Sequence, residues 1–148
     1  MSRRLIATPL AAWEREGVKA ALVKAALPAD DVDDPRVLLW RFETLDAIPV
    51  GFGGLEVFGS DALLRSLVTL PPVRQVGMGA AMVETLETEA LALKCHAIYL
   101  LTASGTDFFA RLGYAVCARS DVPHAVRGSR QFAALCPETA VAMVKHFG

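Results

Sequence analysis

Two glycines lie at a point in the chain where a backbone could bind an anion. Gly77 and Gly79 follow a strand-like segment, 62–70, and lie at the start of a long amphipathic segment, 77–93, that is typical of a helix. The first amides of a helix have no partners within it, and the helix dipole places partial positive charge there. Arg74 adds a full positive charge just before the glycines. This arrangement predicts a site for a phosphate or pyrophosphate group.

The same glycines are also typical of a tight turn between a strand and a helix. Glycine permits a close backbone approach because no Cβ intervenes, and that property suits a turn as well as a ligand. The loop is not a Walker sequence, since no GK[ST] follows, and its spacing is not the G-x-G-x-x-G of a dinucleotide site. From these residues alone, the anion site and the simple turn both remain open.

The elements around the loop predict one α+β domain over residues 1–148. Apolar runs and alternation indicate strands at 5–8, 37–45, 50–58, 62–70, 97–103 and 114–119. Helical spacing covers 10–26, 77–93 and 106–112. The segment 123–135 is expected to be irregular or partly helical, and 140–146 to form a closing strand or helix.

Two further segments predict local features. The acidic segment 29–35, Ala-Asp-Asp-Val-Asp-Asp-Pro, is typical of a solvated loop. Gly51, Gly53 and Gly54 alternate with apolar residues inside a predicted strand. That pattern predicts a bulge or a close approach of another backbone.

The composition argues against several classes of protein. The chain of 148 residues has a formal net charge of −1, so it lacks the basic surface that nucleic-acid binding needs. No apolar run approaches the roughly 20 residues of a membrane span, and no signal-like segment precedes Pro9. The three Cys residues form no CxxC pair, which indicates reduced thiols. We therefore expect a cytoplasmic protein that binds neither nucleic acid nor membrane.

Two motifs carry a resemblance to a known family. Residues 67–80, Leu-Val-Thr-Leu-Pro-Pro-Val-Arg-Gln-Val-Gly-Met-Gly-Ala, resemble motif A of the GNAT acetyltransferase superfamily, with its R/Q-x-x-G-x-G/A core. Residues 108–114, Phe-Phe-Ala-Arg-Leu-Gly-Tyr, resemble the family's F-Y-x-x-x-G-F/Y segment. The predicted order of elements also matches the GNAT fold. The resemblance implies a central, mixed, mostly antiparallel sheet with helices on both faces.

A longer stretch is similar to a narrower subgroup. Residues 106–114, 119–123 and 129–137 resemble the arsenic-resistance N-acetyltransferases. This resemblance implies an acyl-CoA-dependent N-acyltransferase that moves acetyl from acetyl-CoA, its co-substrate, to the amine of a small, amino-acid-like molecule. It also implies a link to arsenic or toxic-compound resistance. Small GNAT proteins often dimerise, so a homodimer is a further implication.

The resemblance assigns the acetyl-CoA site residue by residue. The exposed backbone of the strand before the loop would bind pantetheine as an added strand, and one amide would face the thioester oxygen. The loop would bind the pyrophosphate, and Thr102 stands where an Asn often contacts pantetheine. The implied cofactor-binding residues are Leu67, Val68, Thr69, Arg74, Gln75, Val76, Gly77, Met78, Gly79, Ala80, Thr102 and Phe108.

The catalytic groups depart from the family pattern. Phe109 occupies the position at which many members have a Tyr as general acid, so the resemblance assigns no proton donor. A thiol has a pKa of about 8.5, so thiolate can leave without an acid. Tyr114 is interpreted as a core residue, with an acid as the alternative. Glu56 and Glu43 are the candidate general bases, with exposed strand residues as the alternative.

Four arginines are candidates to bind an acceptor carboxylate through their forked donors, with a charged surface role as the alternative: Arg41, Arg65, Arg127 and Arg130. No metal site is predicted, because the three His residues show no ligand spacing. Cys136 is interpreted as a small buried residue rather than an arsenic ligand. A non-catalytic acetyl-CoA sensor, left open by Phe109, is the alternative function, and a protein-lysine or N-terminal acetyltransferase is less favoured.

Overall fold

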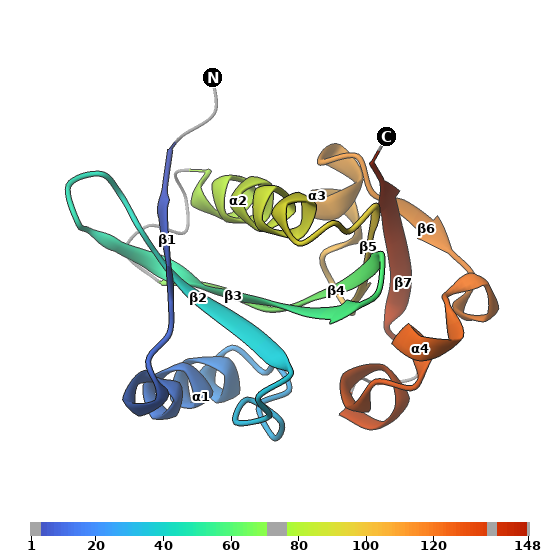
Figure 1. Cartoon of the computed structure of the whole chain (residues 1–148), viewed down its shortest axis with the longest axis horizontal. Helices are drawn as coiled ribbons and strands as arrows, with labels where there is room; N and C mark the ends of the chain where they lie inside the picture. Colours follow the sequence, from blue (N-terminus) through green and yellow to red (C-terminus); the bar gives the residue numbers. More distant parts are fainter. Residues whose placement is uncertain (1–3, 71–76, 136–138, 148) are drawn as a thin grey trace.

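A seven-stranded sheet forms the centre of the computed structural model, which describes residues 4–70, 77–135 and 139–147 (Figure 1). The strands are β1 (Ile6–Pro9), β2 (Val37–Glu43), β3 (Pro49–Phe58), β4 (Asp61–Thr69), β5 (Ala97–Thr102), β6 (Ala115–Cys117) and β7 (Val141–His146). Their order in the sheet is β1-β2-β3-β4-β5-β7-β6. Among the described strands, only β4 and β5 pair in parallel. The predicted mixed, mostly antiparallel sheet is therefore confirmed.

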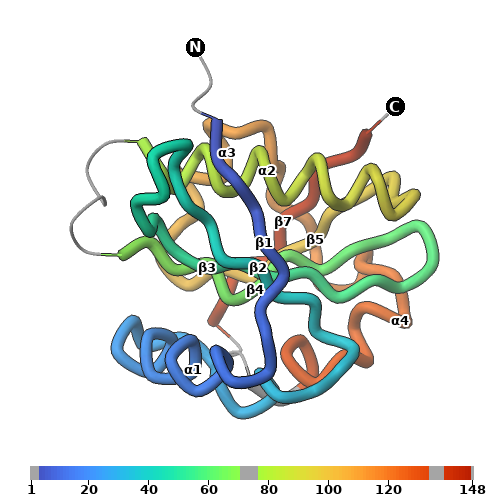
Figure 2. The backbone as a smooth tube through the Cα atoms, turned by 60° about the vertical axis from the view of Figure 1, so that its left-hand side comes forward, coloured from blue at the N-terminus to red at the C-terminus, as the bar shows by residue number. Residues whose placement is uncertain are grey.

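Helices cover both faces of this sheet, as predicted. Figures 1 and 2 place α2 (Met78–Ala92) and α3 (Thr106–Arg111) on one face, and α1 (Arg15–Lys24) and α4 (His124–Arg127) on the other. Three short turns complete the described part: η1 (Ala12–Glu14), η3 (Arg119–Asp121) and the single π-helical turn η4 (Gln131–Leu135). Among the described residues, no helix has the length and apolar character needed to cross a membrane.

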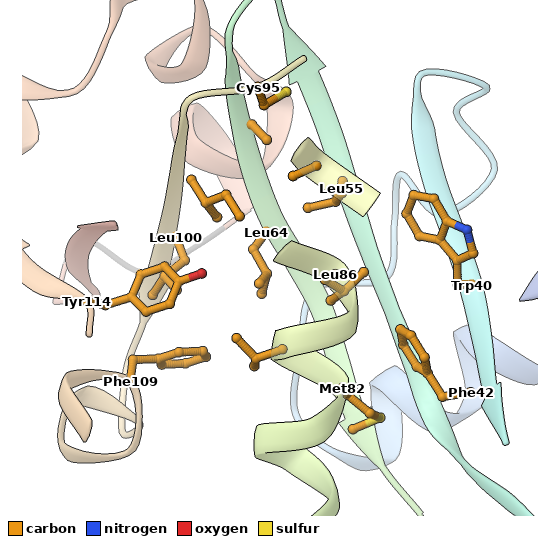
Figure 3. Packing of buried hydrophobic residues seen from close by; sticks show 14 of the residues in the cluster. Trp40, Phe42, Leu55, Leu64, Met82, Leu86, Cys95, Leu100, Phe109 and Tyr114 are labelled. Carbon is orange, nitrogen blue, oxygen red and sulfur yellow. The ribbon is translucent and has the colours of Figure 1, made fainter. Parts of the chain in front are cut away.

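Three apolar clusters hold the helices on the sheet. The largest lies between the sheet and α2, because Met82, Leu86 and other buried residues of α2 recur at a spacing of four and form one stripe. Figure 3 shows Leu86 facing Leu55 of the sheet. On the opposite face, Leu22 anchors a cluster under α1 and Val126 anchors one under α4.

The glycines of β3 permit two close approaches. A Cβ on Gly53 would lie 2.9 Å from Leu86 Cδ1, and one on Gly51 would lie 2.0 Å from the carbonyl oxygen of Val68. The register between β3 and β4 also shifts here, because β4 has one extra residue, and Ser66 has a φ of 59°. Of the two predicted alternatives, the close approach is present in β3, and the bulge lies in β4, the strand opposite these glycines.

Some expected boundaries were wrong. The strand predicted over 37–45 ends at Glu43, and that predicted over 114–119 shortens to β6. The last segment is a strand, β7, and its residues pack alternately into apolar clusters on the two faces of the sheet. Because both faces of β7 are covered, its sequence lacks the alternation of apolar and polar residues that marks a half-exposed strand. The acidic segment 29–35 is not wholly solvated, because Asp31 and Val32 are buried on the α1 face.

Candidate functional site

A cavity opens where two parallel neighbours in the sheet separate. β4 and β5 pair only from Asp61 to Leu63 on one strand and from Ala97 to Tyr99 on the other. Beyond these residues the described parts of the strands diverge, and a cavity of about 420 Å³ lies between them. Its wall includes Leu64, Arg65, Ser66, Leu67, Leu100, Leu101 and Thr102 from the strands. Unpaired strand edges can bind an extended ligand through backbone hydrogen bonds.

The cavity is lined from both faces of the sheet. Phe108 and Phe109 of α3 contribute from the α2 and α3 face. Residues 25–28, which follow α1, and Gln131 of η4 contribute from the opposite face. An occupant of the cavity can therefore be contacted from two sides, by groups that are far apart in the sequence.

The glycine loop leads to the α2 and α3 side of the cavity. Gly77 is the N-cap of α2 with a φ of 75°, a left-handed conformation that favours glycine. A Cβ on Gly79 would lie 3.2 Å from Phe108 Cζ and 3.7 Å from Thr69 Oγ1. The N-terminus of α2 therefore lies next to a residue that lines the cavity, which is the placement an anion site here requires.

The other predicted cofactor-binding residues lie in different settings. Leu67, Thr102 and Phe108 line the cavity. The side chains of Val68 and Met78 pack into the core, so only their backbone can face a ligand. The remaining loop residues, Arg74, Gln75 and Val76, lie outside the described residues. Ala80 lies in the first turn of α2 and is half-buried.

Thr102 holds the turn that carries α3. Its Oγ1 accepts a hydrogen bond of 2.8 Å from the backbone N–H of Gly105. Because Phe108 follows three residues later, this bond helps to place the aromatic wall of the cavity. Thr102 thus positions the site in addition to lining it.

Tyr114 is part of the core and does not line the cavity. Its hydroxyl donates a hydrogen bond of 3.0 Å to Glu87, which also accepts one of 3.1 Å from Lys145 Nζ. Burial and the neighbouring Glu87 carboxylate raise the pKa of Tyr114 above its ordinary value. Phe109 packs edge-to-face against Tyr114, with 5.7 Å between the ring centroids (Figure 3). The interpretation of Tyr114 as a core residue agrees with this environment.

Arg65 forms a buried cluster with two carboxylates. Its guanidinium donates two parallel hydrogen bonds to Asp31 and one of 2.7 Å to Glu56. Nε donates to Ser66 Oγ at 3.1 Å. Burial lowers the pKa of Arg65, but the hydrogen bonds to the two carboxylates outweigh it and leave the pKa raised. One cation and two anions give the Asp31–Arg65–Glu56 cluster a formal charge of −1.

This environment changes the interpretation of the arginines. The donors of Arg65 are directed at Asp31 and Glu56, so an acceptor carboxylate would have to compete with them. Arg41 pairs with Glu14 and Glu43, and within the described residues neither Arg41 nor Glu43 lines the cavity. The structure does not bring these four candidates together at one site, because the last two are exposed, Arg127 at the end of α4 and Arg130 after it.

Sequence reasoning missed two residues of this region. The sequence predicts a solvated loop at Asp31, because four of the seven residues in 29–35 are Asp and nothing in the sequence distinguishes the buried one. Gln131 lies in a segment that is expected to be irregular or partly helical, and a lone Gln carries no pattern. Gln131 is one of the residues that line the cavity, and its Oε1 is buried without a hydrogen-bond partner in the described part of the protein.

A metal centre has no support in the described ranges, where no group of three or more His, Cys, Asp or Glu residues could hold an ion. Burial raises the pKa of both Cys95 and Cys117, which favours the neutral thiol over the thiolate that binds metals. Cys136 lies outside the described residues.

Comparison with known families decides the relationship. The model of the acetyltransferase (GNAT) family matches residues 4–114, which include β4, the glycine loop and the cavity wall up to α3. The chain belongs to the GNAT acetyltransferase family. GNAT enzymes use acetyl-CoA as co-substrate, so the cavity of this GNAT protein is the region to test for acyl-CoA. No curated protein sequence matches the chain.

Solved structures share the fold. N-acetylglutamate synthase from Neisseria gonorrhoeae, complexed with coenzyme A and N-acetyl-glutamate, has a TM-score of 0.77 at 12% identity and is matched over 100% of this chain. The chain spans only 36% of that synthase. Rv2747 from Mycobacterium tuberculosis, in complex with CoA, has a TM-score of 0.73 at 19% identity, with 97% of this chain and 99% of that one covered.

A third structure is an aminoglycoside 6'-N-acetyltransferase complexed with coenzyme A. Its TM-score is 0.66 at 18% identity, with 95% of this chain and 96% of that chain covered. At these identities the likeness establishes the GNAT fold and no acceptor.

The described residues fit an acyl-CoA in two respects. The edges of β4 and β5 beyond Leu63 and Tyr99 are not paired with each other, which suits the amide-bearing pantetheine arm. At Gly79 a Cβ would crowd Phe108, so the absence of a side chain keeps the N-terminus of α2 open next to the cavity.

Proposed function

We propose that this GNAT protein is an N-acetyltransferase that transfers acetyl from acetyl-CoA to the amine of a small molecule. The observation that carries the proposal is the cavity between β4 and β5, which meets the N-terminus of α2 through Phe108 and Gly79. Acetyl-CoA supplies the activated acetyl group. The protein contributes a backbone edge on β4 that can bind it and orient the thioester.

The acceptor and the base are narrower parts of this proposal. An amino-acid-like acceptor and a link to arsenic or toxic-compound resistance are supported only by the sequence resemblance of the C-terminal segment. For the base we favour Glu56 over Glu43. Glu56 contacts Arg65, which lines the cavity, whereas Glu43 contacts Arg41 near η1. A homodimer, a cytoplasmic location and the absence of nucleic-acid binding stay predictions.

The test measures binding and turnover separately. Acetyl-CoA affinity is measured by titration calorimetry, and free thiol release is then followed with a panel of amino acids, polyamines and aminoglycosides. Turnover with at least one amine supports the enzyme. Tight binding of acetyl-CoA without turnover of any amine would favour the sensor, which Phe109 leaves open. No binding would contradict both.

A variant at Gly79 tests whether acetyl-CoA binds beside the N-terminus of α2. The Gly79→Val side chain would collide with Phe108, and we expect acetyl-CoA to bind about tenfold or more weakly, since over-packing typically costs about 1–3 kcal/mol. Gly17→Ala is the control, because a Cβ there meets nothing within 4 Å and Gly17 lies in α1, away from the cavity wall. Unchanged affinity in Gly79→Val would remove the α2 terminus from the site.

A further inference from the structure

One part of the cavity wall belongs to a loop, residues 25–36, that joins α1 to β2. Residues 25–28, Ala-Ala-Leu-Pro, line the cavity directly after the end of α1. Ala26 has a φ of 59°, a left-handed conformation that is strained for a residue with a Cβ. A strained backbone keeps its shape only where the surrounding structure holds it.

The backbone of this loop is bonded to α1. The Leu27 N–H donates to the carbonyl oxygen of Leu22 at 2.9 Å. Arg15 of α1 donates to the carbonyl oxygen of Val32. These bonds hold the loop against its own helix, and neither reaches β4, which forms another part of the cavity wall.

Asp31 connects the loop to β4. Its carboxylate accepts two parallel hydrogen bonds from Arg65, one of them 2.5 Å from Nη1 to Oδ2, and Arg65 lines the cavity. Both side chains are almost fully buried. Ala29 and Val32 also pack in the cluster under α1, but apolar packing is non-directional, whereas a bidentate pair fixes direction and distance. The pair therefore sets where the loop lies relative to β4.

The acidic neighbours of Asp31 have other partners. Asp33 pairs with Lys19 of α1 at 3.7 Å, and Asp34 pairs with Arg36 of the same loop at 3.0 Å. The Asp33 and Arg36 side chains lie mostly in solvent. Within the ion pairs of the described residues, only Asp31 ties this loop to the sheet.

The loop lies on the opposite side of the cavity from the glycine loop. α1 covers one face of the sheet, and α2 and α3 cover the other (Figures 1 and 2). Residues 25–28 line the cavity from the α1 face, whereas Gly79 and Phe108 lie on the α2 and α3 face. A co-substrate bound at the N-terminus of α2, with its pantetheine arm between the strands, leaves the α1 side for the amine.

Resting on the proposed acetyltransferase function, we propose that Asp31 is a positioning residue for the acceptor amine. Acting through Arg65, Asp31 holds residues 25–28 at the separation from β4 at which one acceptor contacts both parts of the wall. Asp31 is not among the described residues that line the cavity, so it acts on the wall and not on a substrate. A displaced wall weakens acceptor binding and leaves the acetyl-CoA side intact.

Asp31→Asn tests this role by steady-state kinetics of thiol release. The probe is the amino acid, polyamine or aminoglycoside of the panel above that the wild type acetylates fastest. We expect the KM for this amine to rise about tenfold, with kcat and the Kd for CoA within about twofold, because the wall contacts parts of the acceptor that do not react. A merely structural role gives another result, since partial unfolding lowers the apparent kcat and leaves KM unchanged.

Asp33→Asn is the matched control, because it makes the same chemical change two residues away on an exposed side chain. KM, kcat and the Kd for CoA should all stay within about twofold of the wild type. If Asp31→Asn does not fold, Asp31→Glu takes its place. It keeps the carboxylate and lengthens the side chain by one methylene group, so the KM for the amine should rise in the same direction.

Amide hydrogen exchange followed by NMR tests the Asp31–Arg65 pair without turnover. In Asp31→Asn we expect the amides of residues 25–27 to exchange about tenfold faster, because local opening of the loop no longer breaks a bidentate charged pair. The amides of α2 should exchange at the wild-type rate, and so should all of these amides in Asp33→Asn.

Four outcomes would overturn the assignment. They are an unchanged KM for the amine in Asp31→Asn, an equal rise in Asp33→Asn, weaker CoA binding in Asp31→Asn, and unchanged exchange at residues 25–27. No thiol release by the wild type with any amine would instead contradict the proposed acetyltransferase. Hydrogen exchange would then decide whether Asp31 holds the loop.

Discussion

Arg65 is a fully buried cation whose position depends on two buried anions. Its side chain has no exposed surface, and the Asp31 and Glu56 side chains are almost as buried. Removing charges from water is costly, and the cost is repaid only when the geometry is good and all partners are present. The two parallel bonds to Asp31 and the bond to Glu56 supply that geometry. The cluster ties the segment after α1 to β3 and β4 behind the cavity.

We predict that Arg65→Met lowers the free energy of unfolding by about 3–5 kcal/mol, because Asp31 and Glu56 would remain buried without their cation. Urea denaturation followed by circular dichroism measures the change. Arg36→Met is the matched control. Arg36 pairs with Asp34, but its side chain is 80% exposed, so the expected loss is at most about 1 kcal/mol. Similar losses in the two variants would show that the Arg65 cluster does not behave as a buried one.

At the scale of the element, the cavity depends on the separation of two strands. β4 has an extra residue around Ser66, which shifts its register against β3, and its pairing with β5 ends at Leu63. β5 stays paired with β7 along its whole length. β4 therefore separates from β5 while β4 stays paired with β3 and β5 stays paired with β7. The turn after β5 then carries α3 over the gap.

We predict that Thr102→Val weakens acetyl-CoA binding although the shape of the side chain is preserved. The loss of the Oγ1 acceptor leaves the Gly105 N–H unpaired and frees the turn that holds Phe108. We expect a loss of about 1–3 kcal/mol in stability and a severalfold weaker affinity for acetyl-CoA. Calorimetric titration and urea denaturation measure the two effects.

Thr102→Ser is the control for this prediction, because it retains the hydroxyl that accepts from Gly105. It should bind acetyl-CoA within about twofold of the wild type. If Thr102→Ser and Thr102→Val lose affinity equally, the hydrogen bond is not what positions the turn.

At the scale of the whole molecule, the cavity joins the two layers of helices. Its wall takes residues from β4, β5, α3, η4 and the segment after α1, so segments far apart in the chain can contact one ligand. A ligand that binds only the folded state stabilises all of it by mass action. This protein is therefore expected to show a large thermal response to its co-substrate.

We predict that CoA at about one hundred times its dissociation constant raises the Tm by roughly 5–10 °C, which corresponds to about 2.7 kcal/mol for a domain of this size. Differential scanning fluorimetry over a range of CoA concentrations measures the shift. Gly79→Val should lose most of it at the same concentrations, and Gly17→Ala should keep it. An equal shift in Gly79→Val would contradict the placement of CoA beside α2.

The sequence by itself determined the elements and the family. Patterns such as the four-residue spacing in α2, the glycines of β3 and the loop before α2 depend on neighbours in the chain, so they can be read without coordinates. The GNAT resemblance that two motifs carry implied the mixed sheet with helices on both faces and pointed to the wall residues Leu67, Thr102 and Phe108.

Only the tertiary structure decided which residues line the α1 and α4 side of the cavity. Asp31 meets Arg65 across 34 positions of the chain, and Gln131 reaches the same cavity from a segment without periodicity. Whether an arginine is free to bind a carboxylate, or a glutamine oxygen lacks a partner, depends on what folding brings beside it. The glycine loop predicted an anion site from neighbours in the chain, whereas the ion pairs of Arg65 behind the cavity depend on long-range contacts.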